Sequence, residues 1–355
     1  MSRSYTAMTS LVTQKLQSAG TADYSVSEVD NQIEEGLKEL ATYQPHLVPV
    51  IFKVESRYGM ASTTSANNLV DTAKGQFLAT DDNNEKVVHN TNDNTWAVVS
   101  SFSSTAQVGL TGDIFIKDEQ YRIYNKYCWN KRQIYVGDVP ENYKIDSIEY
   151  PIGQKRNWVL QENSVVELDV DFVEDSNAGS TLSILPDVDI LVRFSKPHIL
   201  SQLTDYAGTF AATAAAAATS LSATALQGAG TIEVGEEFTV QYHKAVYIVA
   251  ASATIASSAA TITFYPPLEA AVGSTATVLT FRQTSLRPAD EELFADLVAA
   301  RLMINKAPKF MNAVNVGGGA VWSNYMAWGN ARLTETLSKL RRLSPPKFKR
   351  RWPTD

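Results

Sequence analysis

The sequence predicts an α+β protein, in which a small helical bundle of one N-terminal and two C-terminal helices carries large β-sandwich-like insertions. Near the N-terminus and again after residue 288, apolar residues recur every three or four positions, which is the spacing of one helix face. Between these regions, short alternating runs are separated by turns rich in Asn, Asp and Gly, as in β-rich domains. The chain has 355 residues, 44% of them hydrophobic, which is enough for two or three domains.

The first predicted helix begins at Ser25. Ser25 and Glu28 have the spacing of a capping box, in which each side chain satisfies a backbone N–H of the first turn. One apolar stripe follows and consists of Val26, Val29, Ile33, Leu37 and Leu40. Pro45 and Pro49 oppose further helix, so we assign residues 1–47 to the N-terminal part of the bundle. Because a lone helix cannot bury such a stripe, we expect it to pack against the C-terminal helices.

Residues 48–207 are predicted to form a β-rich domain of many short strands. The expected strands are 50–54, 96–99, 114–116, 121–124, 134–136, 158–160, 166–172 and 190–194. Turn-rich segments such as 81–84 and 92–94 separate them. The only cysteine, Cys128, lies between two aromatic residues, and we interpret it as a half-buried strand residue and not as a nucleophile.

A change of composition at Gly208 predicts a second β unit over residues 208–283, either immunoglobulin-like or a barrel. Its Thr-, Val- and Ile-rich runs carry few charges. The alanine run 211–218 has a high helix propensity, but it has no large apolar residue that would dock a helix. We therefore expect an extended linker at this run.

Two C-terminal helices within residues 284–343 are predicted to complete the bundle. Pro288 suits the first turn of a helix, and the acidic residues 290–292 are favourable near its positive end. A glycine loop at 317–319 separates the two helices. Residues 344–355 then form an extended basic tail.

Patterns that carry catalysis or bind cofactors are not found. The four histidines, His46, His89, His198 and His243, form no HExxH motif and have no Ser or Cys nucleophile in a recognisable motif beside them. No glycine loop is followed by the lysine that a phosphate-binding loop needs. We therefore expect a protein without catalytic residues, without a cofactor and without a metal site, and hence not an enzyme.

One acidic cluster stands out in the predicted strand 166–172. Alternation places Glu167, Asp169 and Asp171 on one face of this strand. Three carboxylates on one face can bind a divalent cation. A solvated strand face is the more ordinary interpretation of the same pattern.

Charge is unevenly distributed along the chain. The net charge is −7, yet residues 336–355 contain seven Lys or Arg and one acid. The tail interleaves cations with aromatic residues, in the order Lys347, Phe348, Lys349, Arg350, Arg351 and Trp352. Its flanking prolines oppose a helix, so we expect an extended segment that orders on a partner, with the aromatic side chains as anchors. Nucleic-acid contact and a solvated terminus are the alternatives.

Three stretches resemble the head–tail connector, or adaptor, proteins of tailed bacteriophages. Residues 148–153, Ile-Glu-Tyr-Pro-Ile-Gly, are similar to their IEYP-G stretch, and residues 192–198, ending in Lys-Pro-His, are similar to the strand that follows it there. Residues 294–343 resemble their closing helical pair, and residues 208–282 resemble small β modules of phage virion proteins. The β insertions of this chain are larger than those of minimal connectors.

The resemblance implies a homo-oligomeric ring, usually a dodecamer, in the neck of the virion. It implies the portal protein and tail or neck proteins as partners, with packaged DNA passing through the ring without specific binding. It also implies synthesis in the host cytoplasm, and the sequence contains no signal peptide and no membrane span. Another virion role, as a tail, decoration or host-adhesion component, is the alternative. Exposed aromatic clusters in the β domains would favour adhesion.

Overall fold

The chain forms two compact units, and each unit combines distant parts of the sequence. Among the described residues, unit 1 draws on Met1–Val50, Glu141–Asp146 and Arg193–Lys349, and unit 2 draws on Ile51–Pro140 and Ser147–Val192. The computed structural model describes residues 4–16, 24–55, 57–82, 84–139, 144–170, 189–201, 207–273, 277–310 and 321–343. Helices and strands are both present, which confirms the mixed class that the sequence predicts.

The described part of unit 1 contains four α-helices, where the sequence predicted three. They are α1 (Tyr5–Lys15), α2 (Val26–Tyr43), α3 (Pro288–Lys306) and α4 (Val321–Leu343), with the 3₁₀ helix η4 (Ala307–Phe310) after α3. All four helices contribute to one hydrophobic core, which includes Met8, Val12, Ile33, Leu40, Phe294, Leu297, Val298 and Leu340. Helix α1 was not expected, because its Thr and Ser residues obscure the apolar stripe.

Local signals place the helix starts as predicted. Ser25 and Glu28 form the capping box, with the Ser25 N–H donating to Glu28 Oε2 at 2.8 Å. Pro288 lies in the first turn of α3. Helices α2 and α3 approach closely at Gly36, where a Cβ would lie 2.9 Å from Cγ2 of Val298. The contact between α2 and α3 therefore depends on the absence of a side chain at this position.

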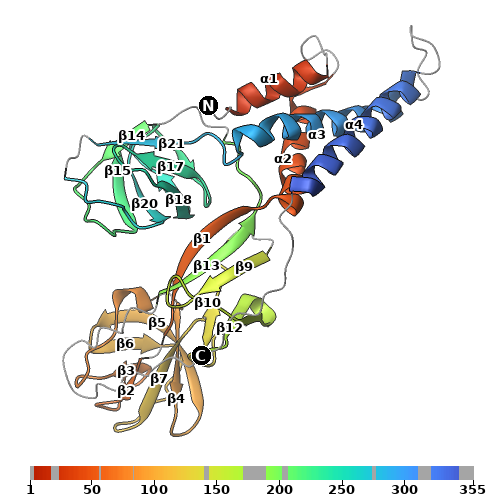
Figure 1. Cartoon of the computed structure of the whole chain (residues 1–355). Helices are drawn as coiled ribbons and strands as arrows, with labels where there is room; N and C mark the ends of the chain where they lie inside the picture. Colours follow the sequence, from red (N-terminus) through yellow and green to blue (C-terminus); the bar gives the residue numbers. More distant parts are fainter. Residues whose placement is uncertain are drawn as a thin grey trace. The chain divides into compact units, whose positions relative to one another are not determined.

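Unit 1 also contains a closed β-barrel, one of the two alternatives that the sequence left open for the small module (Figure 1). Its strands, in spatial order, are β14 (Ala207–Phe210), β15 (Ser220–Thr224), β20 (Ala260–Tyr265), β18 (Val246–Ala251), β17 (Glu237–Val240) and β21 (Val278–Phe281). A separate pair is formed by β16 (Gly230–Ile232) and β19 (Ala253–Ile255). The alanine run is not a linker, because Ala214 and Val272 exchange backbone hydrogen bonds of 3.0 and 2.8 Å.

The main sheet of unit 2 has six strands and is curved in Figure 1. In spatial order they are β2 (Tyr58–Met60), β7 (Gln120–Asn125), β4 (Lys86–Asn90), β5 (Thr95–Ser104), β6 (Gln107–Leu110) and β3 (Asn68–Val70). One face packs on a core that includes Phe77, Val88, Ala97, Val108 and Ile123. The predicted strand 114–116 is wrong, since these residues form a loop, although Phe115 is buried in the same core. This curved sheet takes the place of the expected sandwich.

Two smaller sheets complete the β structure of the described chain. One has the order β11 (Trp158–Leu160), β12 (Val165–Leu168) and β8 (Gln133–Tyr135). The other has the order β1 (His46–Lys53), β13 (Asp189–Lys196), β9 (Lys144–Glu149) and β10 (Lys155–Arg156). Short 3₁₀ turns occur at η2 (Ala79–Asp81) and η3 (Glu162–Ser164). The division between the two units falls within β1, β9 and β13.

Candidate functional site

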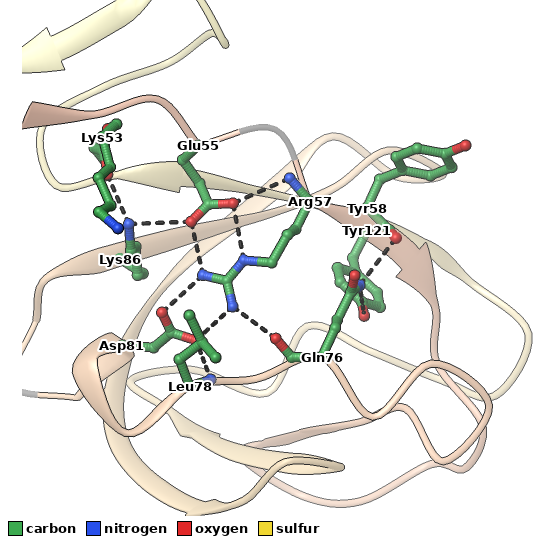
Figure 2. A network of polar contacts seen from close by, with 10 residues as sticks. Lys53, Glu55, Arg57, Tyr58, Gln76, Leu78, Asp81, Lys86 and Tyr121 are labelled. Atoms are coloured by element: carbon green, nitrogen blue, oxygen red, sulfur yellow. Dashed lines mark hydrogen bonds and ion pairs between the residues drawn. The ribbon is translucent and has the colours of Figure 1, made fainter. Parts of the chain in front are cut away.

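Arg57 lies at the centre of a buried network of polar contacts in unit 2 (Figure 2). Its side chain is 3% exposed, and those of its partners Glu55 and Asp81 are 4% and 1% exposed. Nε and Nη2 donate to the two carboxylate oxygens of Glu55 at 2.9 and 2.6 Å. Nη1 and Nη2 donate to those of Asp81 at 2.9 and 2.7 Å, and Nη1 also donates to the carbonyl of Gln76 at 2.8 Å. All five N–H groups of the guanidinium are thus used.

Electrostatic attraction keeps this network charged. Burial alone would raise the pKa of the Glu55 carboxyl, but the charges of Arg57 and Lys86 lower it to about 2. Lys86 contributes through an ion pair of 3.0 Å between its Nζ and Oε2 of Glu55. Burial lowers the pKa of Arg57, but its two carboxylate partners more than reverse this effect. Because removal of one partner would leave a buried charge uncompensated, such a network strongly fixes the local structure.

A second set of hydrogen bonds reaches the backbone of Tyr58. The side-chain amide of Gln76 donates to the Tyr58 carbonyl at 2.9 Å and to the hydroxyl of Tyr121 at 2.6 Å. Tyr121 in turn donates to Oδ2 of Asp71 at 2.6 Å. Gly59 leaves room for this arrangement, since a Cβ there would lie 2.6 Å from the Tyr121 hydroxyl. These hydrogen bonds fix strand β2 from the side of the core. The Tyr58 ring points away from the Arg57 guanidinium (Figure 2).

Several aromatic side chains gather on unit 2, and two of them are largely exposed. Trp129 and Tyr127 are 62% and 58% exposed. The Trp129 ring meets Trp96 edge-on with 5.2 Å between ring centroids, and Trp96 stacks on His89 at 3.9 Å. Tyr127 packs against Tyr135 at 4.7 Å. We call these five residues the aromatic surface.

In unit 1, His46 is buried and His198 is half-buried beside it, with their ring centroids 5.6 Å apart. His46 Nε2 bonds to the carbonyl of Gly235 at 2.7 Å. His198 bonds to the carbonyl of Gln44 at 2.9 Å and to Oγ of Ser285 at 3.0 Å. Burial lowers both pKa values, and the neighbouring His46 further lowers that of His198, to about 4. The His198 imidazole is therefore neutral at neutral pH and joins separate segments of the chain.

The chemistry available at these groups does not resemble a catalytic centre. Ser285 and His198 have the spacing of a nucleophile and a general base, but a base with a pKa of about 4 accepts the hydroxyl proton poorly. Cys128 is buried in a turn after β7, not half-buried in a strand, and burial raises its pKa to about 12. Within the described residues, no cluster of His, Cys, Asp and Glu could hold a metal ion, and no helix has the length and apolar character of a membrane span.

The acidic strand face predicted from the sequence is only partly present. Strand β12 ends one residue before Asp169, which lies exposed in the following bend, so its placement in the strand was wrong. Glu167 does lie in β12, where its carboxylate accepts hydrogen bonds from the amides of Gln161 and Gln133. Asp171 is outside the described residues. The two described carboxylates therefore do not form the expected ladder within one strand.

The predicted docking tail also lies outside the described residues. Helix α4 ends at Leu343, and the tail residues that follow are Lys347, Phe348, Lys349, Arg350, Arg351 and Trp352. Arg341 and Arg342 occupy the last turn of α4 and are exposed. Their charges are favourable at the negative end of a helix, so the basic character already begins on the helix.

Sequence reasoning missed the residues that form the buried network. The segment 81–84 was expected only as a turn between strands, yet the side chain of Asp81 is 1% exposed. Glu55 and Arg57 are two positions apart, so an extended chain places them on the same side. Opposite charges at that spacing directly after an apolar strand were a usable signal. The aromatic surface could not be predicted, because its members belong to different segments of the sequence.

Comparison of the chain with protein-family models, with curated proteins and with solved structures finds no match. The resemblance to connector proteins therefore rests on the three stretches alone. Of these, residues 148–153 begin at the end of β9 and residues 192–198 include the end of β13. These two strands are neighbours in one sheet. Residues 294–343 include most of α3 and all of α4.

Proposed function

We propose that this chain is a non-enzymatic structural protein of a tailed bacteriophage particle, and a subunit of the head–tail connector ring. In this role a homo-oligomer, dodecameric in the expected case, joins the portal protein to tail or neck proteins. DNA passes through the ring without specific binding. The protein is made in the host cytoplasm and resides in the neck of the virion.

The observation that carries the proposal is the shared helical core of unit 1. Helices α1 and α2 precede the β regions in the sequence and α3 and α4 follow them, yet all four contribute to one core. The β regions are thus insertions into a helical scaffold, which is the organisation that the resemblance implies. Gly329, within the stretch similar to connectors, lies where α4 meets α3, since a Cβ there would lie 2.7 Å from Cγ1 of Ile304.

Ion pairs between the helices also support a rigid scaffold. Arg301 of α3 donates to both carboxylate oxygens of Glu39 of α2, at 3.0 and 2.6 Å. Asp296 of α3 forms ion pairs with Lys15 of α1 at 2.7 Å and with Arg332 of α4 at 3.2 Å. Bidentate and shared pairs fix the orientation of the groups that they join. A subunit that repeats around a ring needs such a fixed shape, because each interface must recur identically.

The assembly state of the purified chain tests the proposal. Native mass spectrometry and negative-stain electron microscopy, over a range of protein concentrations, should find closed rings of one subunit number in equilibrium with monomers. Addition of the matching portal protein should shift this equilibrium towards rings. A stable trimer that ignores the portal would contradict the connector role.

A host-adhesion component is the second candidate function, and the aromatic surface favours it. Trp129 and Tyr127 are exposed on unit 2, and large exposed aromatic side chains are typical of binding sites. Adhesion proteins are commonly trimeric, so the same mass measurement separates the two candidates. Adhesion further predicts that particles lacking Trp129 bind host cells less well while their heads and tails still join.

A further inference from the structure

Strand β11 forms an apolar edge of the three-stranded sheet in unit 2. Val159 and Leu160 are 64% and 54% exposed. Because neighbouring residues of a strand point to opposite faces, the exposure of both shows that neither face of this edge is covered. The strand contains no charged residue and no proline, which are common means of protecting an exposed edge.

The backbone groups of Trp158 and Leu160 point away from the sheet. The residues that flank them, Asn157 and Gln161, form backbone hydrogen bonds of 3.1 and 2.7 Å with residues 165–169. Antiparallel strands alternate between hydrogen-bonded and non-hydrogen-bonded residue pairs, so the N–H and C=O groups of Trp158 and Leu160 face outward. Within the described residues, no hydrogen bond to these groups is formed. They are positioned to pair with a further strand.

The two edges of the main sheet, by contrast, are closed by the chain itself. At one edge, the outward carbonyl of Tyr58 in β2 accepts hydrogen bonds from Nζ of Lys74 at 2.6 Å and from the amide of Gln76 at 2.9 Å. At the other edge, the outward carbonyl of Val70 in β3 accepts from the N–H of Ser62 at 2.7 Å. Strand β11 lacks such protection within the described residues, although an unprotected apolar edge is a template for pairing with another chain.

A second copy of β11 matches this edge in antiparallel orientation. With Val159 opposite Val159 of the second copy, Trp158 lies opposite Leu160 of that copy, and every outward N–H and C=O group of both strands finds a partner. Apolar side chains then face apolar ones, and Asn157 faces Gln161. A shift by two residues, the smallest that keeps the outward groups facing each other, would place Val159 opposite Asn157 or Gln161 instead.

We propose that β11 pairs with β11 of a second copy of this chain, so that the three strands of each copy form one continuous sheet across a two-fold axis. Charge favours the antiparallel orientation. Lys155 and Arg156 precede the strand and Glu162 follows it, so antiparallel pairing brings the basic end of one copy to the acidic end of the other. Parallel pairing would bring like charges together.

The dimer is expected to be weak. A strand of three residues offers a small interface, and interfaces below roughly 1,200 Å² are weak or transient. The pair should therefore form reversibly at high protein concentration. An extended segment of a different protein is the rival occupant, since such segments also add to sheet edges. The self-matching register and the charges at the two ends favour a second copy.

The proposal goes beyond the connector role and does not depend on it. A closed ring uses heterologous contacts, in which two different surface patches meet, whereas the β11 pair joins the same patch of both copies. Variants that lose the dimer should still form rings, and a chain that forms no ring can still dimerise through β11. The two experiments therefore fail separately.

The test begins with the unchanged full chain. Sedimentation velocity over a concentration series separates monomer, dimer and ring, and the dimer fraction should rise with concentration. Hydrogen exchange of the segment 157–162, measured over the same series, should slow as dimers form, because the outward N–H groups of Trp158 and Leu160 become bonded. A chain that forms no dimer at any concentration overturns the proposal and leaves the edge to an extended segment of another protein.

Charge exchange at Val159 then tests the register. Val159→Lys and Val159→Glu should each weaken dimerisation about tenfold or more, because residue 159 lies opposite itself and like charges that face each other repel. An equal mixture of the two variants should restore the dimer. The 64% exposure of Val159 makes misfolding of these variants a small concern, and thermal melting checks it.

Ile116→Lys is the matched control, because Ile116 is 59% exposed in a loop of unit 2 and lies outside β11. It should dimerise like the unchanged protein. A dimer that persists in Val159→Lys, or an equal loss in Ile116→Lys, overturns the proposal. A mixture of Val159→Lys and Val159→Glu that stays monomeric overturns it as well, since opposite charges would then not face each other.

Discussion

Arg57 and Tyr58 are consecutive residues whose side chains serve opposite sides of the same sheet edge. The Arg57 guanidinium is buried between two carboxylates, and the Tyr58 ring is half-exposed on the outer face, opposite Arg122 of β7. Gln76 connects the two, because its carbonyl accepts from Arg57 and its amide donates to the Tyr58 carbonyl. The position of the Tyr58 ring therefore depends on charged groups in the interior, and a change at Arg57 should disturb this ring as well as the stability of unit 2.

Replacing Arg57 by Met should destabilise unit 2 by about 3–5 kcal/mol, because Glu55 and Asp81 would then be buried without their partner. Unfolding by guanidinium chloride, followed by tryptophan fluorescence, measures this loss of stability. Lys53→Met is the control, since Lys53 is 76% exposed and its ion pair with Asp189 is 3.8 Å long; exposed pairs contribute little. Equal effects of the two substitutions would show that the buried network has no special role.

Unit 2 should lose stability in acid through Glu55. Its folded pKa of about 2 lies below the ordinary value of about 4.3, so its contribution is complete above roughly pH 4.3 and is lost as the pH falls towards 2. The loss over this window is on the order of 3 kcal/mol. Glu55→Gln should flatten the plot of unfolding free energy against pH between these values. An unchanged slope in the variant would assign the acid sensitivity to other carboxyls.

Acid should also destabilise unit 1, through His198, and this loss should begin at a higher pH than the loss in unit 2. Its folded pKa of about 4 is below the ordinary value of about 6.5, so the unfolded chain takes up a proton first as the pH falls. Stability is therefore unaffected above roughly pH 6.5 and declines by on the order of 3 kcal/mol towards pH 4. Melting temperatures of His198→Gln over this range should show a smaller slope. His243→Gln, measured in parallel, separates this effect from the general loss of an imidazole.

The helical core should not tolerate a charge. Leu37 and Leu297 are 8% and 0% exposed in the shared core, so Leu37→Asp or Leu297→Asp should cost about 4 kcal/mol or more and yield insoluble protein. Leu343→Asp is the control, because Leu343 is 53% exposed at the end of α4. Expression followed by thermal melting distinguishes the variants. A folded Leu297→Asp protein with an unchanged melting temperature would contradict the assignment of this core.

The basic tail should be needed for joining and not for folding. Leu340 is the last core residue of α4, so a chain truncated after Leu343 should stay folded. It should leave heads without tails, because a repeated docking segment adds weak contacts into a stable joint. Phe348→Ala and Trp352→Ala should weaken attachment more than Lys347→Ala, since buried anchors contribute more than rim charges. Particle counts by electron microscopy measure attachment, and normal joining by the truncated chain would rule out docking by the tail.

Structural features that depend on a short stretch of sequence were predictable. The capping box at Ser25 and the start of α3 at Pro288 depend only on neighbouring residues, and both lie where the sequence placed them. Helix α1 was missed because Ser and Thr residues interrupt the stripe of Met8, Leu11 and Val12. Ser and Thr compete with the helix backbone for hydrogen bonds, so its stability derives from packing on α3 and not from local preference.

Features that depend on strand register were not predictable. His89 belongs to β4, a strand that was not expected beside the Asn-rich segment 92–94. Without β4, nothing in the sequence brings Arg122 and Trp96 to opposite sides of one imidazole. A shift of one residue would turn each side chain to the other face, so the stacking of His89 on Trp96 can be foreseen only once the pairing is known. The same holds for Asp81, because its ion pair with Arg57 joins residues that are distant in the sequence.

The division of the helical core between distant segments has a consequence for biosynthesis. At translation rates of about 5–20 residues per second, the roughly 250 residues between α2 and α3 delay the partner of α2 by roughly 12–50 seconds. During that interval the apolar side of α2 has no α3 to cover it, while the main sheet of unit 2, complete by Asn125, is free to fold on the ribosome. A chaperone that shields exposed apolar helices should therefore engage the nascent chain early and leave it only when α3 and α4 have emerged.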